Sequence, residues 1–310
     1  MKITVIIPCL NEAKAIEATI SEVQKVLPLA EIVVIDNGST DRTVEIAKNS
    51  GASILKEPSP GKGYAVRRGF SHITNKSNPV LLIDGDATYE IAPISLALKL
   101  LLEDGFDMII GRRVNELDKI DGARKERFRL GHAFGNRVLS FLFRKLFKLD
   151  IHDTLSGWRL MSPGFYNSFP GGASGFEIEA ELNAHAFTLD AAVKEIPVTY
   201  RGRLEDSHSK LRTYSDGLKI LRRNFSLFRS ERPSLAYGLL AVPWLGVSFY
   251  LGQEVLRTYF DTGLVPRFPS LIASVGGFIV AGNLWVTGMI LEKVRLHRVA
   301  LARMIYSDHS

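Results

Sequence analysis

The fold is decided by two stretches, ITVIIPCLNE (residues 3–12) and EIVVIDNGSTD (residues 31–41). In each, a run of Val and Ile typical of a buried parallel strand ends in polar residues. The pattern returns at VLLIDGD (residues 80–86) and MIIGRR (residues 108–113), with helical stretches between, the first at about 12–27. Alternating strands and helices predict a mostly parallel α/β sheet with helices on both faces.

Polar residues stand at the end of each of these predicted strands. They are Asn11-Glu12, Asp36-Asn37-Gly38, Asp84-Gly85-Asp86 and Arg112-Arg113. Ligands of open α/β sheets bind beyond the carboxyl ends of the strands. We therefore expect the four clusters to build one site.

Composition narrows the class of protein without choosing a partner. A chain of 310 residues is long enough for about two domains. Its 46% hydrophobic and 23% charged residues exclude a disordered tail and a disulfide scaffold. Cys9, the single cysteine, favours a reducing compartment. The net charge of +6 indicates an anionic partner, either nucleic acid, a nucleotide or an anionic membrane surface.

The N-terminus does not have the pattern of a secretory signal. Its apolar run, residues 3–7, ends at Pro8. A signal has about 7–15 apolar residues and a small-residue cleavage site. We therefore expect the first residues to be cytoplasmic.

The positive mean hydropathy of +0.07 comes from the last quarter of the chain. Residues 234–252 and 268–291 carry no charge, and about 20 apolar residues are enough to span the hydrocarbon core. We interpret both stretches as transmembrane helices, the alternative being two buried helices of a soluble domain. The chain then divides into an α/β domain at 1–232 and a membrane anchor at 233–310.

Basic residues flank the two predicted spans on the sides away from their connecting loop. They are Arg222, Arg223, Arg229 and Arg232 before the first span and Lys293, Arg295, Arg298 and Arg303 after the second. The positive-inside rule therefore predicts a multi-pass protein of the cell (inner) membrane with its α/β domain in the cytoplasm.

Two further segments, at about 124–148 and 212–232, combine apolar residues at helical spacing with Arg and Lys. Basic amphipathic helices of this kind lie in the membrane interface and meet anionic headgroups. For the first segment the alternative is an ordinary helix packed on the sheet. The second leads directly into a predicted span, which favours the interface.

Gly61-Lys62-Gly63 resembles two nucleotide-binding motifs without matching either. A phosphate-binding loop needs Gly where the chain has Lys56, and a Ser or Thr directly after Lys62. The dinucleotide fingerprint needs Gly or Ala where the chain has Val66. No His and Cys residues have zinc-site spacing, and no nucleic-acid module is recognisable, so we expect no nucleic-acid partner.

The triplet Asp84-Gly85-Asp86 has the clearest chemistry. Two carboxylates separated by one small residue, directly after an apolar strand, are suited to share a divalent cation with a substrate diphosphate. Mg²⁺ and Mn²⁺ prefer carboxylate oxygens and complete their shell with phosphate and water. Asp36 and Lys62, which we expect at the same sheet edge, favour this interpretation over a simple turn.

The quoted motifs resemble a known family. Residues 6–12 and 34–41, together with the Gly61-Lys62-Gly63 and Asp84-Gly85-Asp86 motifs, resemble the inverting family 2 glycosyltransferases of the GT-A fold. DTLSGWR (residues 153–159) and EIPV (residues 195–198), followed by Arg203, Ser209 and Lys210, resemble its polyprenyl-phosphate branch. That branch contains dolichol-phosphate mannose synthases and bacterial undecaprenyl-phosphate glucosyltransferases, some of which have two C-terminal spans.

The chain departs from the family pattern at Asn37, where a second aspartate is frequent. An asparagine can hydrogen-bond a base or ribose without charge, so we assign more weight to Asp36. The Gln-x-x-Arg-Trp motif of processive synthases is missing from the sequence. The resemblance therefore implies transfer of one sugar per turnover.

The resemblance implies a role for each candidate residue. The nucleotide pocket would contain Pro8, Asn11, Glu12, Asp36, Lys62 and Asp84. Asp84 and Asp86 would hold Mg²⁺ or Mn²⁺ against the diphosphate. The acceptor phosphate would be gripped by Arg113, Arg127, Arg203, Ser209 and Lys210. The catalytic set would be Asp86, Asp153, Arg113 and Arg203, in which Asp153 orients the acceptor or acts as a base.

A helix start is predicted at FEIEAE (residues 176–181), near the site. We interpret Glu177 and Glu179 as carboxylates on the helix surface. Contact with sugar hydroxyls is the alternative.

A polyprenyl monophosphate has a second pKa of about 6, so at pH 7 it is already an anionic nucleophile and needs positioning more than a base. The resemblance thus implies a metal-dependent, inverting transferase that moves one sugar to this lipid in the bilayer. UDP-glucose is the first expectation for the donor, while GDP-mannose and a UDP-uronic acid stay open. An alternative from another class is a catalytically silent nucleotide-binding scaffold, and a homo-oligomer is a further expectation.

Overall fold

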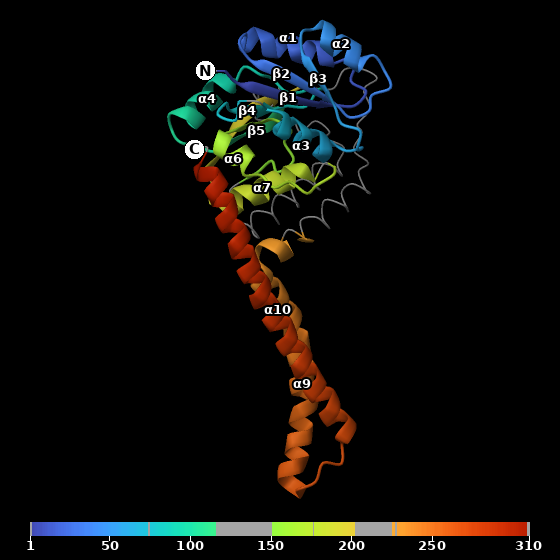
Figure 1. Cartoon of the computed structure of the whole chain (residues 1–310). Coiled ribbons are helices and arrows are strands. Elements are labelled where there is room, and N and C mark those ends of the chain that lie inside the picture. The colour runs from blue at the N-terminus through green and yellow to red at the C-terminus, as the bar shows by residue number, and fades with distance from the viewer. Residues whose placement is uncertain are drawn as a thin grey trace. The chain divides into compact units, whose positions relative to one another are not determined.

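The structure is a computed structural model that describes residues 2–73, 75–115, 151–175, 177–201, 225–226 and 228–308. The chain forms two compact units, one of Met1–Asn224 with Leu301–Ser310 and the other of Phe225–Ala300. The first contains the sheet with its helices, and the second contains one long helix and most of another (Figure 1).

The first unit is built on a sheet with the strand order β3-β2-β1-β4-β6-β5-β7. The strands are β1 (Thr4–Cys9), β2 (Glu31–Asp36), β3 (Ser53–Lys56), β4 (Val80–Leu82), β5 (Met108–Asn115), β6 (Arg159–Met161) and β7 (Val193–Tyr200). Among these described strands, β6 alone runs antiparallel to its neighbours, β4 and β5. The predicted α/β class with a mostly parallel sheet is confirmed.

Helices cover both faces of this sheet (Figure 1). They are α1 (Ile16–Val26), α2 (Thr43–Asn49), α3 (Lys62–His72), α4 (Ile94–Leu102), α6 (Pro163–Asn167) and α7 (Ile178–Leu189). On β1, Val5 and Ile7 pack with α1 and α4, whereas Ile6 packs with α3 and α7. Alternate residues of a strand point to opposite faces, which explains why this strand is apolar throughout.

The first helix begins later than the sequence pattern indicates. Asn11 adopts a left-handed φ of +51°, and the Glu12 carbonyl accepts the N–H groups of Ala15 and Ile16. The helix therefore starts only at Ile16, and the polar residues after β1 stay in a turn at the sheet edge.

The second unit contains all of α9 (Pro233–Thr262) and most of α10 (Phe268–Ser307), and both helices are long and apolar enough to cross a membrane. Small residues bring the two helices close together. Ser274 Oγ donates to the Ser248 carbonyl at 2.8 Å, and a side chain on Gly277 would collide with Ser248 Oγ. Small residues serve this purpose in lipid, where packing and hydrogen bonds drive helix association.

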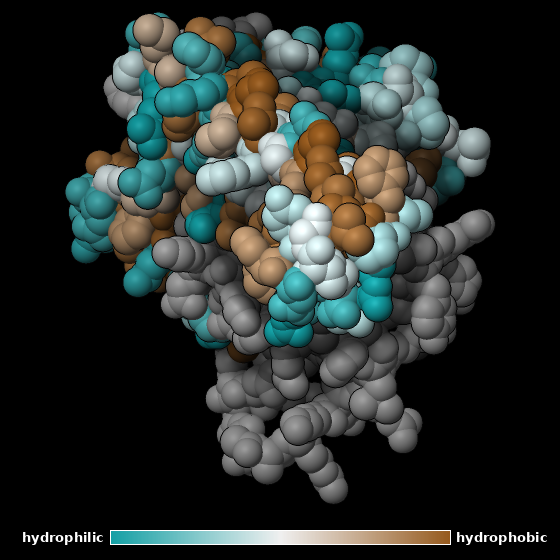
Figure 2. Space-filling view, turned by 90° about the horizontal axis from the view of Figure 1, so that it is seen from below, coloured by the Kyte–Doolittle hydropathy of each residue, from teal (hydrophilic) through white to brown (hydrophobic). Residues whose placement is uncertain are grey.

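The apolar side chains of α9 and α10 are mostly exposed. Only 17% and 22% of their most apolar stretches are buried. In the view from below, hydrophobic side chains are open to the surface (Figure 2). Buried helices of a soluble domain would show the opposite, so the exposure favours helices that face lipid.

The predicted interfacial helices lie largely outside the described residues. This applies to all of 124–148, and to 212–224 and 227 of the second segment. The division into domains at 232 and 233 stays a prediction.

Candidate functional site

The strand order brings the four polar clusters to one edge of the sheet. β2, β1 and β4 are parallel neighbours, so Asp36, Asn11 and Asp84 follow strands that end side by side. Because β6 is antiparallel to both β4 and β5, β5 runs in the same direction as β4. Arg113, near the end of β5, therefore belongs to the same edge.

Hydrogen bonds connect the turns after β1 and β2. Asn11 Oδ1 accepts the N–H of Thr40 at 2.7 Å, and the Asn11 N–H donates to Ser39 Oγ at 3.0 Å. The buried carboxylate of Asp36 accepts the N–H of Ser39 at 2.9 Å. These bonds join the first two motifs into one surface at the mouth of the sheet.

Pro8 and Glu12 flank the turn after β1. Pro8 pairs with Ile35 in the β1–β2 register, and the Glu12 N–H donates to Thr43 Oγ1 at 2.8 Å. At the start of α2, Asp41 accepts the N–H of Thr43 at 3.0 Å. Partial burial alone would raise the pKa of Asp41, but its hydrogen bonds lower the pKa below the usual value.

Asn37 has a structural role that the sequence did not reveal. Its Oδ1 accepts the N–H of Gly61 at 2.6 Å, and its Nδ2 donates to the carbonyls of Glu57 and Ser59 at 3.1 and 2.7 Å. An aspartate has no N–H to donate to those carbonyls. The asparagine therefore ties β2 to the loop before α3.

Lys62 joins two carboxylates from different elements. Its Nζ lies 2.5 Å from Asp84 Oδ1 after β4 and 2.6 Å from Glu179 Oε1 on α7. We name these three residues the Lys62 cluster. Burial alone would lower the pKa of Lys62, but the two carboxylates raise it above its usual value, so the ammonium stays charged.

The interpretation of Glu179 as a surface carboxylate is wrong. Its side chain is 3% exposed, and burial raises the pKa of Glu179 above its usual value although Lys62 opposes this. Glu181 is buried as well. A sequence signal was present, because the polar residues of α7 do not form one solvent-facing side and its apolar residues occur around the helix.

The backbone after residue 171 fits against the Gly61-Lys62-Gly63 turn. The Gly63 N–H donates to the Ser174 carbonyl at 3.0 Å, and a Cβ on Gly63 would lie 2.3 Å from the Ala173 carbonyl oxygen. Glu181 holds this segment by accepting the N–H groups of Gly172 and Ala173 at 2.7 and 2.8 Å. The glycines thus let α3 begin close to α7, which places Lys62 between its partners.

The two aspartates of the Asp84-Gly85-Asp86 motif have different partners. Asp84 bonds Lys62, and a Cβ on Gly157 would lie 2.2 Å from Asp84 Oδ2. Asp86 Oδ1 accepts the hydroxyl of Thr88 at 2.5 Å. Within the described part of the chain, no group of three or more His, Cys, Asp or Glu could hold a metal ion. The carboxylate oxygens suit Mg²⁺ or Mn²⁺ if a substrate diphosphate and water complete the shell.

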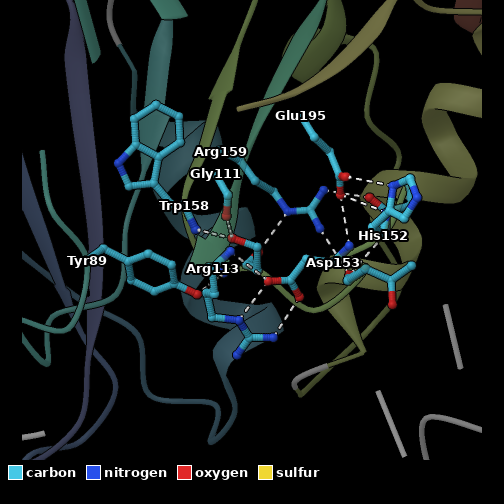
Figure 3. A network of polar contacts seen from close by, with 12 residues as sticks. Tyr89, Gly111, Arg113, His152, Asp153, Trp158, Arg159 and Glu195 are labelled. Carbon is cyan, nitrogen blue, oxygen red and sulfur yellow. Dashed lines mark hydrogen bonds and ion pairs between the residues drawn. The ribbon is translucent and has the colours of Figure 1, made fainter. Parts of the chain in front are cut away.

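Arg113 and Asp153 form a bidentate ion pair, which we name the Arg113 fork (Figure 3). Arg113 Nε donates to Asp153 Oδ2 at 2.8 Å, and Nη2 donates to Oδ1 at 2.7 Å. The guanidinium also lies over the Tyr200 ring, 5.6 Å from its centroid. Burial would lower the pKa of Arg113, but Tyr89 and Asp153 hold it well above its usual value.

The two ion pairs are exposed in opposite ways. In the Lys62 cluster, the side chain of Lys62 is 11% exposed and that of Asp84 is 28% exposed. In the Arg113 fork, Arg113 is 21% exposed and Asp153 is 7% exposed. One end of the site therefore presents a carboxylate and the other presents a guanidinium.

The segment that contains Asp153 is held from two sides (Figure 3). Glu195 Oε1, on β7, accepts the N–H groups of His152 and Asp153 at 2.9 and 2.8 Å. On the other side, the fully buried Arg159 donates to the carbonyls of Thr154 and Ser156, both at 3.1 Å. Burial lowers the pKa of Arg159, although nearby carboxylates raise it.

The match to a family model is direct. The model described as Glycosyl transferase family 2 matches residues 4–167, which is more than half of the chain. This chain belongs to glycosyl transferase family 2. The resemblance of its motifs to that family is confirmed.

Two relatives of this family 2 chain come from Haloferax volcanii. Glycosyltransferase AglJ is 28% identical over 309 residues, covering 97% of this chain and 97% of AglJ. A dolichyl-phosphate hexose transferase is 28% identical over 232 residues, covering 74% of this chain and 95% of that protein. The similarity to these two relatives therefore covers more of the chain than the family model, which matches residues 4–167.

A solved structure supports the GT-A fold of this family 2 chain. Glucosyl-3-phosphoglycerate synthase from Mycobacterium tuberculosis, in complex with Mn²⁺, UDP-glucose and phosphoglyceric acid, is similar with a TM-score of 0.55. The two are 23% identical, over 73% of this chain and 79% of that chain. At this identity the likeness concerns the fold alone, and the predicted GT-A architecture is confirmed.

Part of the predicted family 2 site lies outside the described residues. This applies to Arg127, Arg203, Ser209 and Lys210, all expected at the acceptor phosphate. The roles of the other candidates stay predictions. Glu195 and Arg159 stand within quoted motifs. Glu195 contacts His152 and Asp153, more than 40 residues away, which sequence spacing does not reveal. Arg159 contacts carbonyls of its own motif and also Asn183 on α7, and only the latter contact comes from a distant segment.

Proposed function

We propose that this family 2 glycosyltransferase moves one sugar from a nucleoside diphosphate to a polyprenyl phosphate, with inversion. The observation that supports it most directly is the opposite exposure of the Lys62 cluster and the Arg113 fork at one sheet edge. An exposed carboxylate suits a cation bound to a diphosphate, and an exposed guanidinium suits a phosphate monoester.

On the donor side, the nucleotide pocket would be formed by Pro8, Asn11, Glu12, Asp36, Lys62 and Asp84. Asp84 and Asp86 would hold Mg²⁺ or Mn²⁺. When bound, such an ion supplies positive charge next to the leaving diphosphate. Relatives in the family fold support this assignment, since the synthase described above was solved with Mn²⁺ and UDP-glucose.

On the acceptor side, Arg113 would bind the lipid phosphate, with Arg127, Arg203, Ser209 and Lys210 as further contacts. A phosphate oxygen forms a bond to the anomeric carbon on the face opposite the leaving group. The bond from that carbon to the diphosphate oxygen breaks, and its electron pair leaves with the nucleoside diphosphate. An α-linked donor would thus give a β-linked lipid-phosphate sugar. Since the phosphate is already anionic, orientation by the arginine supplies what the step needs.

A lipid acceptor agrees with the second unit of the chain. α9 and α10 have exposed apolar surfaces of membrane-spanning length, and one relative is named a dolichyl-phosphate hexose transferase. We propose that residues 233–310 anchor the protein in the cell (inner) membrane as a multi-pass segment. By the positive-inside rule, the domain at 1–232 then works at the cytoplasmic face.

The identity of the sugar depends on loop geometry around its hydroxyls. UDP-glucose is our first choice of donor, and GDP-mannose or a UDP-uronic acid are the alternatives. The candidate from another class is a silent scaffold that binds nucleotide without turnover, and the built Lys62 cluster and Arg113 fork argue against it. Assembly into a homo-oligomer stays a prediction.

The test is a donor panel with the full-length protein in detergent. The protein is incubated with undecaprenyl phosphate, Mg²⁺ or Mn²⁺, and a set of UDP- and GDP-sugars, and nucleoside diphosphate release is measured. Release that requires both lipid and metal with one donor would support the proposal and name the sugar. Nucleotide binding without release from any donor would favour the scaffold.

A further inference from the structure

The ion pair with Asp153 holds Arg113 in place but does not engage all of the N–H donors of its guanidinium. The fork engages Nε and Nη2, which are two of the three nitrogens of the guanidinium. A guanidinium has five N–H donors, so a fork of two bonds leaves donors for a phosphate. Where Arg113 points is therefore decided by where the Asp153 carboxylate lies.

Asp153 is in turn placed by Glu195. The Glu195 side chain is 10% exposed, and its Oε1 accepts the backbone N–H groups of both His152 and Asp153. Its Oε2 lies 3.2 Å from His152 Nδ1. Hydrogen bonds from N–H groups to a carboxylate are stronger than neutral ones, so this residue fixes the backbone of the segment.

Glu195 and Arg113 stand on the same rigid support. β5 and β7 are parallel neighbours, and Glu195 pairs with Ile110, three residues before Arg113. The sheet therefore fixes the backbone positions of Glu195 and Arg113, and Asp153 contacts both residues. Through Asp153, the place of Glu195 on β7 therefore determines where the guanidinium of Arg113 lies.

We propose that Glu195 is a positioning residue that sets the orientation of Arg113 through Asp153. The inference rests on the proposed function, because it needs Arg113 to bind the acceptor phosphate. In this role Glu195 contacts the His152–Asp153 segment and not the substrates. Loss of its contacts should therefore affect use of the lipid phosphate and leave use of the sugar nucleotide unchanged.

The first experiment compares E195A with E195Q in the full-length protein, using undecaprenyl phosphate as acceptor. E195A should lower kcat/KM for the lipid about 10- to 100-fold, because misplacement of a binding group by about 1 Å has effects of this size. The KM for the donor should stay at the wild-type value. E195Q should stay within about fivefold of wild type, since its carbonyl oxygen can accept the same two N–H groups.

Lys194, exposed on the same strand, gives the matched control K194A, which should behave as wild type. If E195A fails to fold, E195D replaces it. Its carboxylate is one carbon shorter and cannot reach both N–H groups in the same place, so the same lipid-selective loss is expected. An equal loss for lipid and donor would overturn the proposal.

A double-mutant cycle separates this inference from the proposed function. If Glu195 acts through Arg113, adding E195A to R113A should change lipid use by less than about twofold, because residues in one network are not additive. Full additivity, with R113A still selective for the lipid, would remove the positioning role and keep the function. If R113A leaves lipid use unchanged, the proposed acceptor site itself fails.

Discussion

The Lys62 cluster and the Arg113 fork contain the same kinds of groups in opposite arrangements. Both join a cation to a carboxylate from a distant part of the chain, but Lys62 is more buried than Asp84, whereas Arg113 is less buried than Asp153. The more exposed group of each ion pair decides the sign of the charge that the pair can bind. In the proposed function, a single sheet edge thus offers a place for a cation and a place for an anion.

The difference also concerns how each pair is supported. Lys62 bonds two carboxylates, and Glu179 is almost fully buried, so this cluster is closed on its inner side. Arg113 bonds one carboxylate, and its guanidinium lies over the ring of Tyr200. Its side chain is 21% exposed, compared with 11% for Lys62. We expect the first cluster to matter more for stability and the second more for binding.

The largest effect should come from D86A, which tests the carboxylate end of the comparison. A metal ion contributes several kcal/mol to such reactions, so kcat should fall by about 10³-fold. Steady-state turnover with Mg²⁺ or Mn²⁺ measures this. D104A, at an exposed aspartate, is the matched control and should keep full turnover. Wild-type turnover in D86A would contradict the metal site.

K62M tests whether the Lys62 cluster is the stabilising one. Removal of the ammonium leaves the buried Glu179 without its partner, which should lower the free energy of unfolding by about 3–5 kcal/mol. R113M at the more exposed fork should cost less, about 1–3 kcal/mol. Denaturant unfolding of both variants measures the difference. Equal losses would break the comparison between the two pairs.

G157A sharpens the comparison by moving one carboxylate without removing it. The added Cβ would lie 2.2 Å from Asp84 Oδ2, so the carboxylate must shift from the place where it bonds Lys62. A displacement of this size should lower kcat/KM for the donor about 10- to 100-fold. The control is G246A, where a Cβ meets nothing within 4 Å. Unchanged donor kinetics in G157A would count against a role for the Asp84 position.

D41N should have the smallest effect and provides a baseline. Asp41 stands exposed next to the start of α2, where it accepts hydrogen bonds from Thr43 and from the Ala13 N–H. Asparagine keeps one acceptor oxygen, so the change removes one exposed hydrogen bond and a charge near the helix start, together worth about 1 kcal/mol. Because the pKa of Asp41 is lowered in the folded state, its contribution is present above an unfolded pKa of about 4. It should be lost as pH falls through the lowered value. Unfolding of wild type and D41N from pH 7 down to pH 2 measures this, and a difference that grows in acid would contradict the assignment.

The pattern of apolar and polar residues along the sequence was sufficient to predict much of the secondary structure and the sheet of this protein. The strand before Pro8 and the polar residues that follow β1, β2 and β4 are adjacent in sequence, so composition and order predicted both the sheet and the edge at which these polar residues gather. The apolar segments of α9 and α10 were predicted for the same reason, because spanning length is a property of consecutive residues. The late start of α1 was missed, since it depends on the left-handed turn at Asn11.

What the sequence alone determined is therefore the α/β class, the four polar clusters and the two apolar helices. The tertiary structure decided which charges meet: Lys62 with Glu179, 117 residues apart, and Arg113 with Asp153, 40 residues apart. It also decided that β6 runs antiparallel, which inserts Arg159 behind the Asp153 segment. The physical reason is that hydrophobic periodicity is read from neighbouring residues, whereas an ion pair depends on which distant segments pack together and how deeply each partner is buried.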